Sequence, residues 1–187
     1  KSFPEKVTVR FVFQSVCPTP DKTSDGSTNG RLQEKGYAVA CPIIIDVWNA
    51  SWQQWKTELD KLTIDEDTIF VGLSAGGYAL LRYLGESEKR VKKAIQVAPS
   101  APGFDREDGV RFPHQADFYS YEITAQLKSL IRERVVEFVS NDADFILQAV
   151  EVYKKVLDAK VIKLEDRGHF SFLIPEFPEL LKEIEES

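Results

Sequence analysis

The sequence predicts an α/β fold, a doubly wound and mostly parallel sheet with helices on both faces. Two patterns indicate it. Short β-rich apolar runs alternate with amphipathic helical stretches, and runs such as residues 69–73 are apolar at nearly every position. Such runs are typical of parallel strands covered on both faces, joined by right-handed crossovers. The chain has 187 residues, so we expect residues 1–187 to form a single domain.

The same patterns place the individual elements. One helix is indicated by Trp52, Trp55 and Leu59, which share a face at i, i+3 and i+7. Two stretches, 15–29 and 99–121, are interrupted by Pro and Gly and are predicted as loops that follow strand ends, where α/β sheets bind ligands. The predicted strands are 7–14, 37–41, 68–73, 94–98, 135–140 and 160–164, and the helices are 51–62, 75–84, 146–157 and one opened by Pro175.

Composition excludes several classes of function. The net charge of −6 argues against nucleic acid or an anionic membrane as a partner. The sequence has no apolar stretch long enough to span a membrane and no recognisable signal peptide, so we expect a cytoplasmic protein. The two cysteines, Cys17 and Cys41, form no metal-binding pattern, and we expect no metal or cofactor. Two free thiols are the simpler interpretation, with a disulfide between them as the alternative.

The strongest motif is the sequence Gly72-Leu73-Ser74-Ala75-Gly76, which reads G-x-S-x-G between a predicted strand and a predicted helix. In that position the motif predicts a nucleophile elbow, a sharp turn that lifts the serine hydroxyl out at the sheet edge. The backbone N–H of Ala75, at the helix N-terminus, would then serve as an oxyanion donor. The alternative is a glycine-rich turn that only packs tightly or holds a phosphate, but no G-x-G-x-x-G pattern or P-loop lysine is present.

A serine nucleophile needs a base and an acid that orients it. Of the two histidines, His114 and His169, only His169 can be third in the order serine, acid, histidine. The acid should follow the strand at 135–140, where Asp142 and Asp144 compete, and Asp142 is nearer the strand end. Either aspartate could instead cap the helix that follows.

At this point the chain resembles a known group, the small lid-less serine hydrolases related to retinoblastoma-binding protein 9 and the bacterial YdeN proteins. The resemblance covers roughly residues 45–185. It rests on W-x3-L and D-x-x-T-I-F-V-G-x-S-x-G within 55–76, V-x-F-x-S-x-D at 136–142 and G-H-F at 168–170. It implies a compact, Rossmann-like α/β-hydrolase without a cap domain, a Ser74–Asp142–His169 triad and hydrolysis of small esters or amides. The family's acid lies 27 positions before its histidine, which points to Asp142.

The chain departs from the family pattern in the loop after the first strand, which in the family usually carries a His-Gly pair that helps to form the oxyanion hole. Gln14, Ser15 and Val16 stand there instead, so the second oxyanion donor would be the N–H of Ser15 or Val16, with Gln14 facing the substrate. The acid loop also lacks the family's D-D-P.

Aromatic residues of 99–121 would line an apolar pocket of moderate size, and the expected substrate contacts there are Phe112, Phe118 and Tyr119.

The resemblance implies a serine hydrolase that forms an acyl-enzyme with a small-molecule ester or amide. We expect a monomer or small homo-oligomer. Two other functions stay open. The same acyl-enzyme could be resolved by an alcohol or thiol, which would make the protein an acyltransferase. The protein could also be catalytically weak or inactive and bind ligands on this scaffold. The missing His-Gly pair favours this last reading, because the loss of one oxyanion donor can cost about 10² to 10³ in rate.

Overall fold

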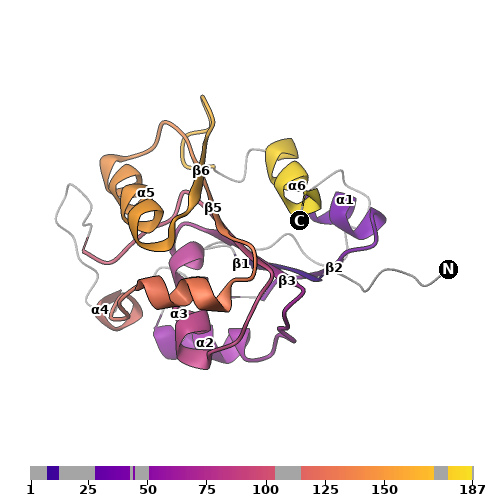
Figure 1. Ribbon diagram of the computed structural model, residues 1–187, viewed down its shortest axis with the longest axis horizontal. Coiled ribbons are helices and arrows are strands. Elements are labelled where there is room, and N and C mark those ends of the chain that lie inside the picture. The colour runs from indigo at the N-terminus through magenta and orange to yellow at the C-terminus, as the bar shows by residue number, and fades with distance from the viewer. Residues whose placement is uncertain are drawn as a thin grey trace.

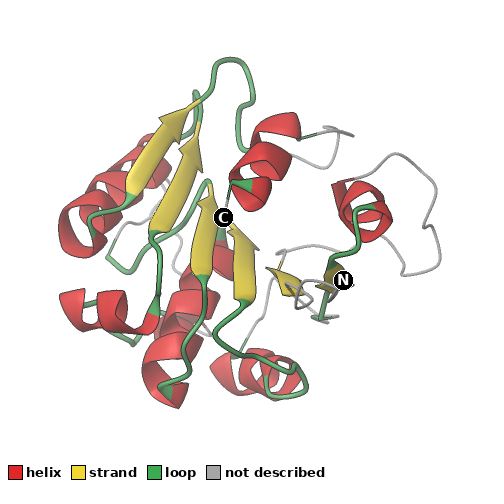
Figure 2. Ribbon diagram, turned by 45° about the vertical axis from the view of Figure 1, so that its right-hand side comes forward, coloured by secondary structure: helices red, strands yellow, loops and turns green. Residues whose placement is uncertain are grey.

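The computed structural model describes residues 8–12, 28–42, 44, 51–103, 115–170 and 177–186. The described strands form one parallel sheet in the order β2-β1-β3-β4-β5-β6. Figure 2 shows neighbouring strand arrows running in the same direction, with helices on both sides of them. The predicted α/β architecture is therefore confirmed. The strands are β1 (Thr8–Val12), β2 (Ala38–Ala40), β3 (Thr68–Leu73), β4 (Lys93–Val97), β5 (Val135–Val139) and β6 (Lys160–Lys163).

Helices cover the sheet in two layers, seen from another side in Figure 1. Alternate strand residues explain the division, since successive side chains of a strand point to opposite faces. Phe70, Ala94 and Val135 belong to the core cluster with α2, α3, η2 and α5, whereas Ile69 and Ile95 pack with α1 and α6. The helices are α1 (Thr28–Glu34), α2 (Trp52–Leu59), α3 (Ala75–Ser87), α4 (Gln115–Phe118), η2 (Ala125–Leu130, a 3-10 helix), α5 (Asp144–Leu157) and α6 (Pro178–Glu185).

Several predicted boundaries differ from the structure by one to three residues, and the predictions for two loops and the last helix are wrong. The loop expected at 15–29 ends earlier, because Thr28 and Asn29 already belong to α1, and α4 lies inside the stretch 99–121. The last helix begins at Pro178 and not at Pro175, which lies outside the described residues. Proline is favoured at the first helical position in either case, so the sequence pattern could not choose between the two.

The expectation of two free thiols is also wrong, because Cys41 is disulfide-bonded. The other cysteine of the chain, Cys17, lies outside the described residues. Spacing in the sequence does not show whether two cysteines approach closely enough to bond, so the sequence could not settle this point. Disulfides persist mainly in oxidising compartments, and the bond therefore does not support the cytoplasmic expectation.

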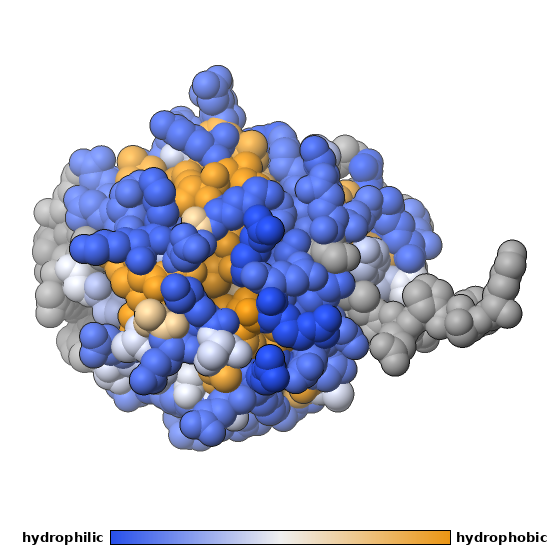
Figure 3. Space-filling model, viewed as in Figure 1, coloured by the Kyte–Doolittle hydropathy of each residue, from blue (hydrophilic) through white to orange (hydrophobic). Residues whose placement is uncertain are grey.

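One face of the molecule shows the charged character of the sequence. Figure 3 shows a face covered mostly by hydrophilic residues, with hydrophobic residues visible in the gaps between them. In the described part of the chain, no helix has the length and apolar character needed to cross a bilayer.

Candidate active site

Ser74 sits in a sharp turn between β3 and α3, as the motif predicts. Its φ of 53° and ψ of −123° lie in a region that residues other than glycine rarely adopt. Three backbone hydrogen bonds hold the turn. The Ser74 N–H donates to the Val97 carbonyl (2.9 Å), and the Ser74 carbonyl accepts from the N–H groups of Gly77 (3.0 Å) and Ser100 (3.3 Å). The Ser74 side chain makes no helix-capping bond, so its hydroxyl is not used to hold the turn.

Glycine at position 72 allows α3 to fold back tightly onto the strand that precedes it. A Cβ atom on Gly72 would lie 2.6 Å from both the Cα and the N of Gly77, closer than real Cβ contacts come. The turn therefore needs glycine there. Ala75 is the first residue of α3, and N–H groups at that end of a helix have no acceptor within the helix. The position fits the predicted oxyanion donor.

Asp142 and His169 are brought together from the ends of neighbouring strands. The Nδ1 of His169 lies 2.6 Å from Oδ2 of Asp142. The carboxylate is well buried, with 6 % of the Asp142 side chain exposed, whereas 43 % of the His169 side chain is exposed. Asp144 is instead the first residue of α5, where a negative charge is favourable near the helix N-terminus. The geometry therefore assigns the two aspartates different places, with Asp142 against the histidine.

Short polar side chains fix the histidine loop to the acid loop. The Ser140 hydroxyl accepts from the Arg167 N–H (2.9 Å), and the Asn141 side-chain oxygen accepts from the Gly168 N–H (3.1 Å). The Ser140 hydroxyl also donates to that Asn141 oxygen (2.8 Å). Sequence reasoning missed both residues. Their signal is the Ser-Asn pair placed between the strand end and Asp142.

The backbone is left-handed on both sides of His169, a conformation that costs glycine little but strains phenylalanine. Gly168 and Phe170 have φ of 51°, in the left-handed region. Phe170 is nonetheless held in place, because it is 6 % exposed and its ring stacks on Phe177 at a centroid distance of 5.3 Å. The G-H-F motif thus has a physical role, with phenylalanine as an anchor in the core and glycine as the bend.

The aromatic residues expected to line a pocket lie at different depths. Tyr119 is linked to the elbow, because its hydroxyl lies 2.8 Å from the Ser100 hydroxyl and the Ser100 N–H bonds the Ser74 carbonyl. Phe118 is 2 % exposed and packs edge-on against Trp55 at a centroid distance of 5.1 Å. Phe118 is therefore part of the hydrophobic core and does not offer an exposed surface to a substrate.

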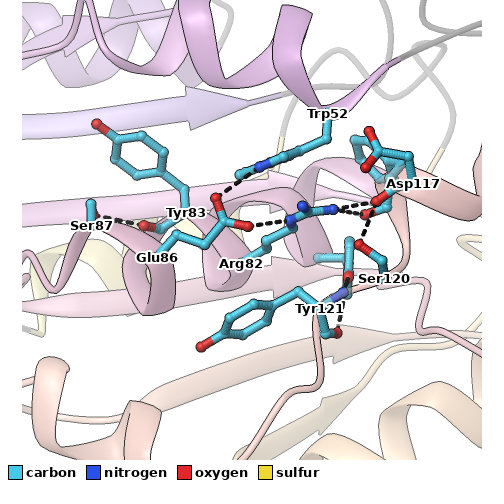
Figure 4. A network of polar contacts seen from close by, with 10 residues as sticks. Trp52, Arg82, Tyr83, Glu86, Ser87, Asp117, Ser120 and Tyr121 are labelled. Carbon is cyan, nitrogen blue, oxygen red and sulfur yellow. Dashed lines mark hydrogen bonds and ion pairs between the residues drawn. The ribbon is translucent and has the colours of Figure 1, made fainter.

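A polar network anchors this aromatic segment to α3 (Figure 4). The Arg82 guanidinium donates to the carbonyls of Asp117 and Phe118, the latter at 2.8 Å, and to Glu86 Oε1 at 2.7 Å. It also lies over the Trp52 ring, 4.2 Å from the centroid, and Trp52 donates to the other oxygen of Glu86. Sequence reasoning did not find Arg82, which is a buried charge in a helix that otherwise faces the core.

The remaining predicted site residues lie outside the described part of the chain: Gln14, Ser15, Val16 and Phe112. The described residues include no cluster of three or more His, Cys, Asp or Glu side chains that could hold a metal ion. Within the described residues, the candidate site comprises Ser74 at the end of β3, Ser100 after β4, Asp142 after β5 and His169 after β6. All four follow carboxyl ends of parallel strands, which meet at one edge of the sheet.

The fold matches those of several solved structures along nearly its whole length. The ydeN gene product from B. subtilis has a TM-score of 0.74 at 16 % identity, with 98 % of this chain and 100 % of that chain covered. Est1E from Butyrivibrio proteoclasticus has a TM-score of 0.68 at 13 % identity (98 % and 87 % covered). Alpha/beta hydrolase domain-containing protein 10 from mouse has 0.63 at 14 % (97 % and 89 % covered).

Sequence comparison adds nothing to this likeness, since no protein-family model and no curated protein matches the chain. At these identities the solved structures establish the fold alone. The expectation drawn from the sequence motifs is confirmed at that level: the chain has the compact α/β-hydrolase fold of YdeN-like proteins.

Proposed function

We propose that the protein is a serine hydrolase that cleaves small carboxylic esters or amides through an acyl-enzyme on Ser74. The observation that carries the proposal is the contact between Asp142 and His169, at the same sheet edge as a strained serine turn. Structural packing alone does not require a half-exposed histidine on a buried carboxylate. Solved structures of the same fold that are described as carboxylesterases or hydrolases add support.

The mechanism follows from the roles that such groups play. His169 takes the proton of the Ser74 hydroxyl as the oxygen attacks the acyl carbonyl, and then returns it to the leaving alcohol or amine. Asp142 holds the imidazole through Nδ1 and stabilises its charged form. Because Nδ1 is bound to Asp142, Nε2 is the nitrogen that accepts the serine proton. The Ala75 N–H stabilises the negative oxygen of the tetrahedral intermediate. Water then attacks the acyl group, with His169 as base, and releases the acid.

The first experiment is labelling with a fluorophosphonate probe, followed by intact mass and peptide mapping. The parent protein should gain one label, on the peptide that contains Ser74, and Ser74→Ala and His169→Ala should gain none. A folded parent that takes up no label would contradict the hydrolase proposal. Mapping also distinguishes Ser74 from its neighbour Ser100, which shares the same corner of the sheet.

The two aspartates provide a matched pair for the acid. Asp142→Asn should lower kcat for a short acyl ester by about 10⁴, the loss expected when a triad histidine is held in the wrong tautomer. Asp144→Asn makes the same chemical change two positions along the chain and should leave kcat within a factor of about two, because Asp144 lies in the first turn of α5. Equal losses in both variants would exclude Asp142 as the specific partner of His169.

A further inference from the structure

Two polar residues lie side by side in the interior of the sheet, where apolar residues are expected. Gln96 of β4 is paired in register with Glu137 of β5, and they are 2 % and 0 % exposed. They share the face of Ala94 and Val135, the face covered by α3 and α5. Adjacent strands lie about 4.8 Å apart, so these two side chains are direct neighbours.

Their hydrogen bonds are incomplete in a specific way. The Gln96 Nε2 donates to the Gly77 carbonyl in the first turn of α3 (3.2 Å). Within the described part of the chain, Gln96 Oε1 and both oxygens of Glu137 have no hydrogen-bond partner. All three atoms are acceptors when Glu137 is ionised, so they cannot bond one another. A protonated carboxyl group has an O–H donor, and with it the two neighbours become complementary.

The surroundings favour the protonated carboxyl. Among the described residues, Glu137 interacts electrostatically with Glu151 and Tyr153 of α5, and Tyr153 in turn with Tyr78 of α3 and Tyr119. None is a cation. The tyrosine hydroxyls are engaged elsewhere, since Tyr153 donates to the Ser100 carbonyl (2.6 Å) and Tyr78 to the Tyr121 carbonyl (3.0 Å). Burial, with a smaller contribution from the charge of Glu151, raises the pKa of Glu137 to about 9.

We propose that Glu137 is protonated at neutral pH and that its carboxyl O–H donates a hydrogen bond to Gln96 Oε1, which fixes the Gln96 amide against Gly77 behind the serine elbow. Glu137 is then a positioning residue. It acts through Gln96 on the turn whose Gly77 N–H bonds the Ser74 carbonyl. The proton on Glu137 is independent of the proposed hydrolase function, whereas the benefit to Ser74 rests on it.

The first test is infrared difference spectroscopy of the parent against Glu137→Gln. At neutral pH the parent should show the C=O band of a protonated carboxylic acid that the variant lacks, and the band should disappear as the pH passes about 9. Absence of such a band at neutral pH would overturn the proposal. This result requires no catalytic activity, and the band can be titrated in the parent alone if the variant fails to fold.

The second test compares denaturant unfolding of the parent with that of Glu137→Gln as pH rises. Between 4.5 and about 9 the folded parent holds a proton that the unfolded chain has released, so its stability falls with pH. The unfolding constant of the parent should rise relative to that of the variant by up to about tenfold per pH unit in that window. Parallel pH profiles would contradict the assignment. Glu151→Gln, the same change on the exposed side of α5, should keep most of the slope, because burial is the larger cause.

The link to the elbow has its own readout. Glu137→Gln supplies an amide N–H to Gln96, whereas Glu137→Leu leaves Gln96 Oε1 without a donor. We expect fluorophosphonate labelling of Ser74 to be about tenfold slower in the leucine variant than in the glutamine variant, the effect of one buried unpaired acceptor. Equal labelling rates in the two variants would contradict the positioning role, and the infrared result alone would then decide the protonation of Glu137. If the parent itself takes up no label, the proposed hydrolase function is contradicted, but the infrared result on Glu137 still stands.

Discussion

Gly72 and Gly77 lie on either side of the serine turn, but they differ in the space that surrounds them. A Cβ at Gly72 would lie 2.6 Å from backbone atoms of Gly77, which have no freedom to move aside. A Cβ at Gly77 would meet its nearest neighbour, the Gly72 carbonyl oxygen, at 3.4 Å, an ordinary contact. Gly72→Ala should therefore lower the free energy of unfolding by about 3 kcal/mol, at the upper end of overpacking costs.

Gly77→Ala is the control for that prediction. It adds the same methyl group to the same turn, inside a helix where alanine is favoured over glycine by about 1 kcal/mol. We expect its stability to equal or exceed that of the parent in urea unfolding. Similar losses of unfolding free energy in both variants would mean that the turn tolerates a side chain at neither position. The specific requirement for glycine at position 72 would then be contradicted.

The sequence located the candidate nucleophile and histidine, but it left Asp142 and Asp144 as alternatives. Both lie in one short loop, and local patterns cannot show which carboxylate turns towards a residue elsewhere in the chain. The bonds from Ser140 and Asn141 to the histidine loop determine this arrangement. They join residues of different strands and form only after the sheet has assembled, so no local spacing encodes them.

At the scale of elements, Arg82 joins α3 to the segment that ends in Tyr119. Its side chain is 7 % exposed, and its bonds to two backbone carbonyls and to Glu86 cannot be replaced by water without rearrangement. Arg82→Leu should cost about 2 to 3 kcal/mol of stability, since it removes charged hydrogen bonds in the interior. Without these bonds the segment should open more often, so we expect faster amide hydrogen exchange at 117–121. Because the Tyr119 hydroxyl contacts Ser100, which is bonded to the serine turn, we also expect a raised KM.

Arg90→Leu provides the comparison for Arg82. Its ion pair with Glu66 spans 3.3 Å, but both side chains are more than half exposed. Exposed pairs contribute little, so we expect a change of less than about 0.5 kcal/mol and unaltered exchange at 117–121. If Arg82→Leu behaves like this control, the network in Figure 4 does not hold the segment.

Elements with strong periodicity could be predicted and those without it could not. The sequence predicts the strand 68–73 and the helix with Trp52, Trp55 and Leu59 on one face, because the spacing of their apolar residues indicates which sides are buried. The short helix α1 contains Thr28, Asn29 and Gly30, which are weak helix formers. Its stability comes from packing, since Leu32 is fully buried in the cluster with α6. Such tertiary support has no local signature.

At the scale of the whole molecule, two buried glutamates oppose each other in their response to pH. Burial raises the pKa of Glu137 to about 9, so its contribution to stability is lost as pH rises. For Glu183 burial alone would raise the pKa, but hydrogen bonds from Lys160 and Lys93 outweigh it and lower the pKa. Its contribution is present above the ordinary value of 4.5 and is lost as pH falls through the folded value. The two residues thus limit stability from opposite sides.

Glu183 also ties the C-terminal helix to the sheet, which makes it the residue to change. Its carboxylate lies 3.1 Å from Lys93 Nζ of β4 and 2.6 Å from Lys160 Nζ of β6, and Lys93 is 2 % exposed. Glu183→Gln should cost about 2 kcal/mol at neutral pH, because the buried Lys93 then keeps only the partly exposed Glu133, at 3.4 Å, as a counter-charge. Urea unfolding at decreasing pH should show that Glu183→Gln loses stability less steeply than the parent does. Glu186→Gln, at the C-cap of α6 in an exposed pair with Lys182, should change neither quantity. If Glu183→Gln kept the acid response of the parent, another carboxylate would have to set it, and the attachment of α6 would not depend on charge.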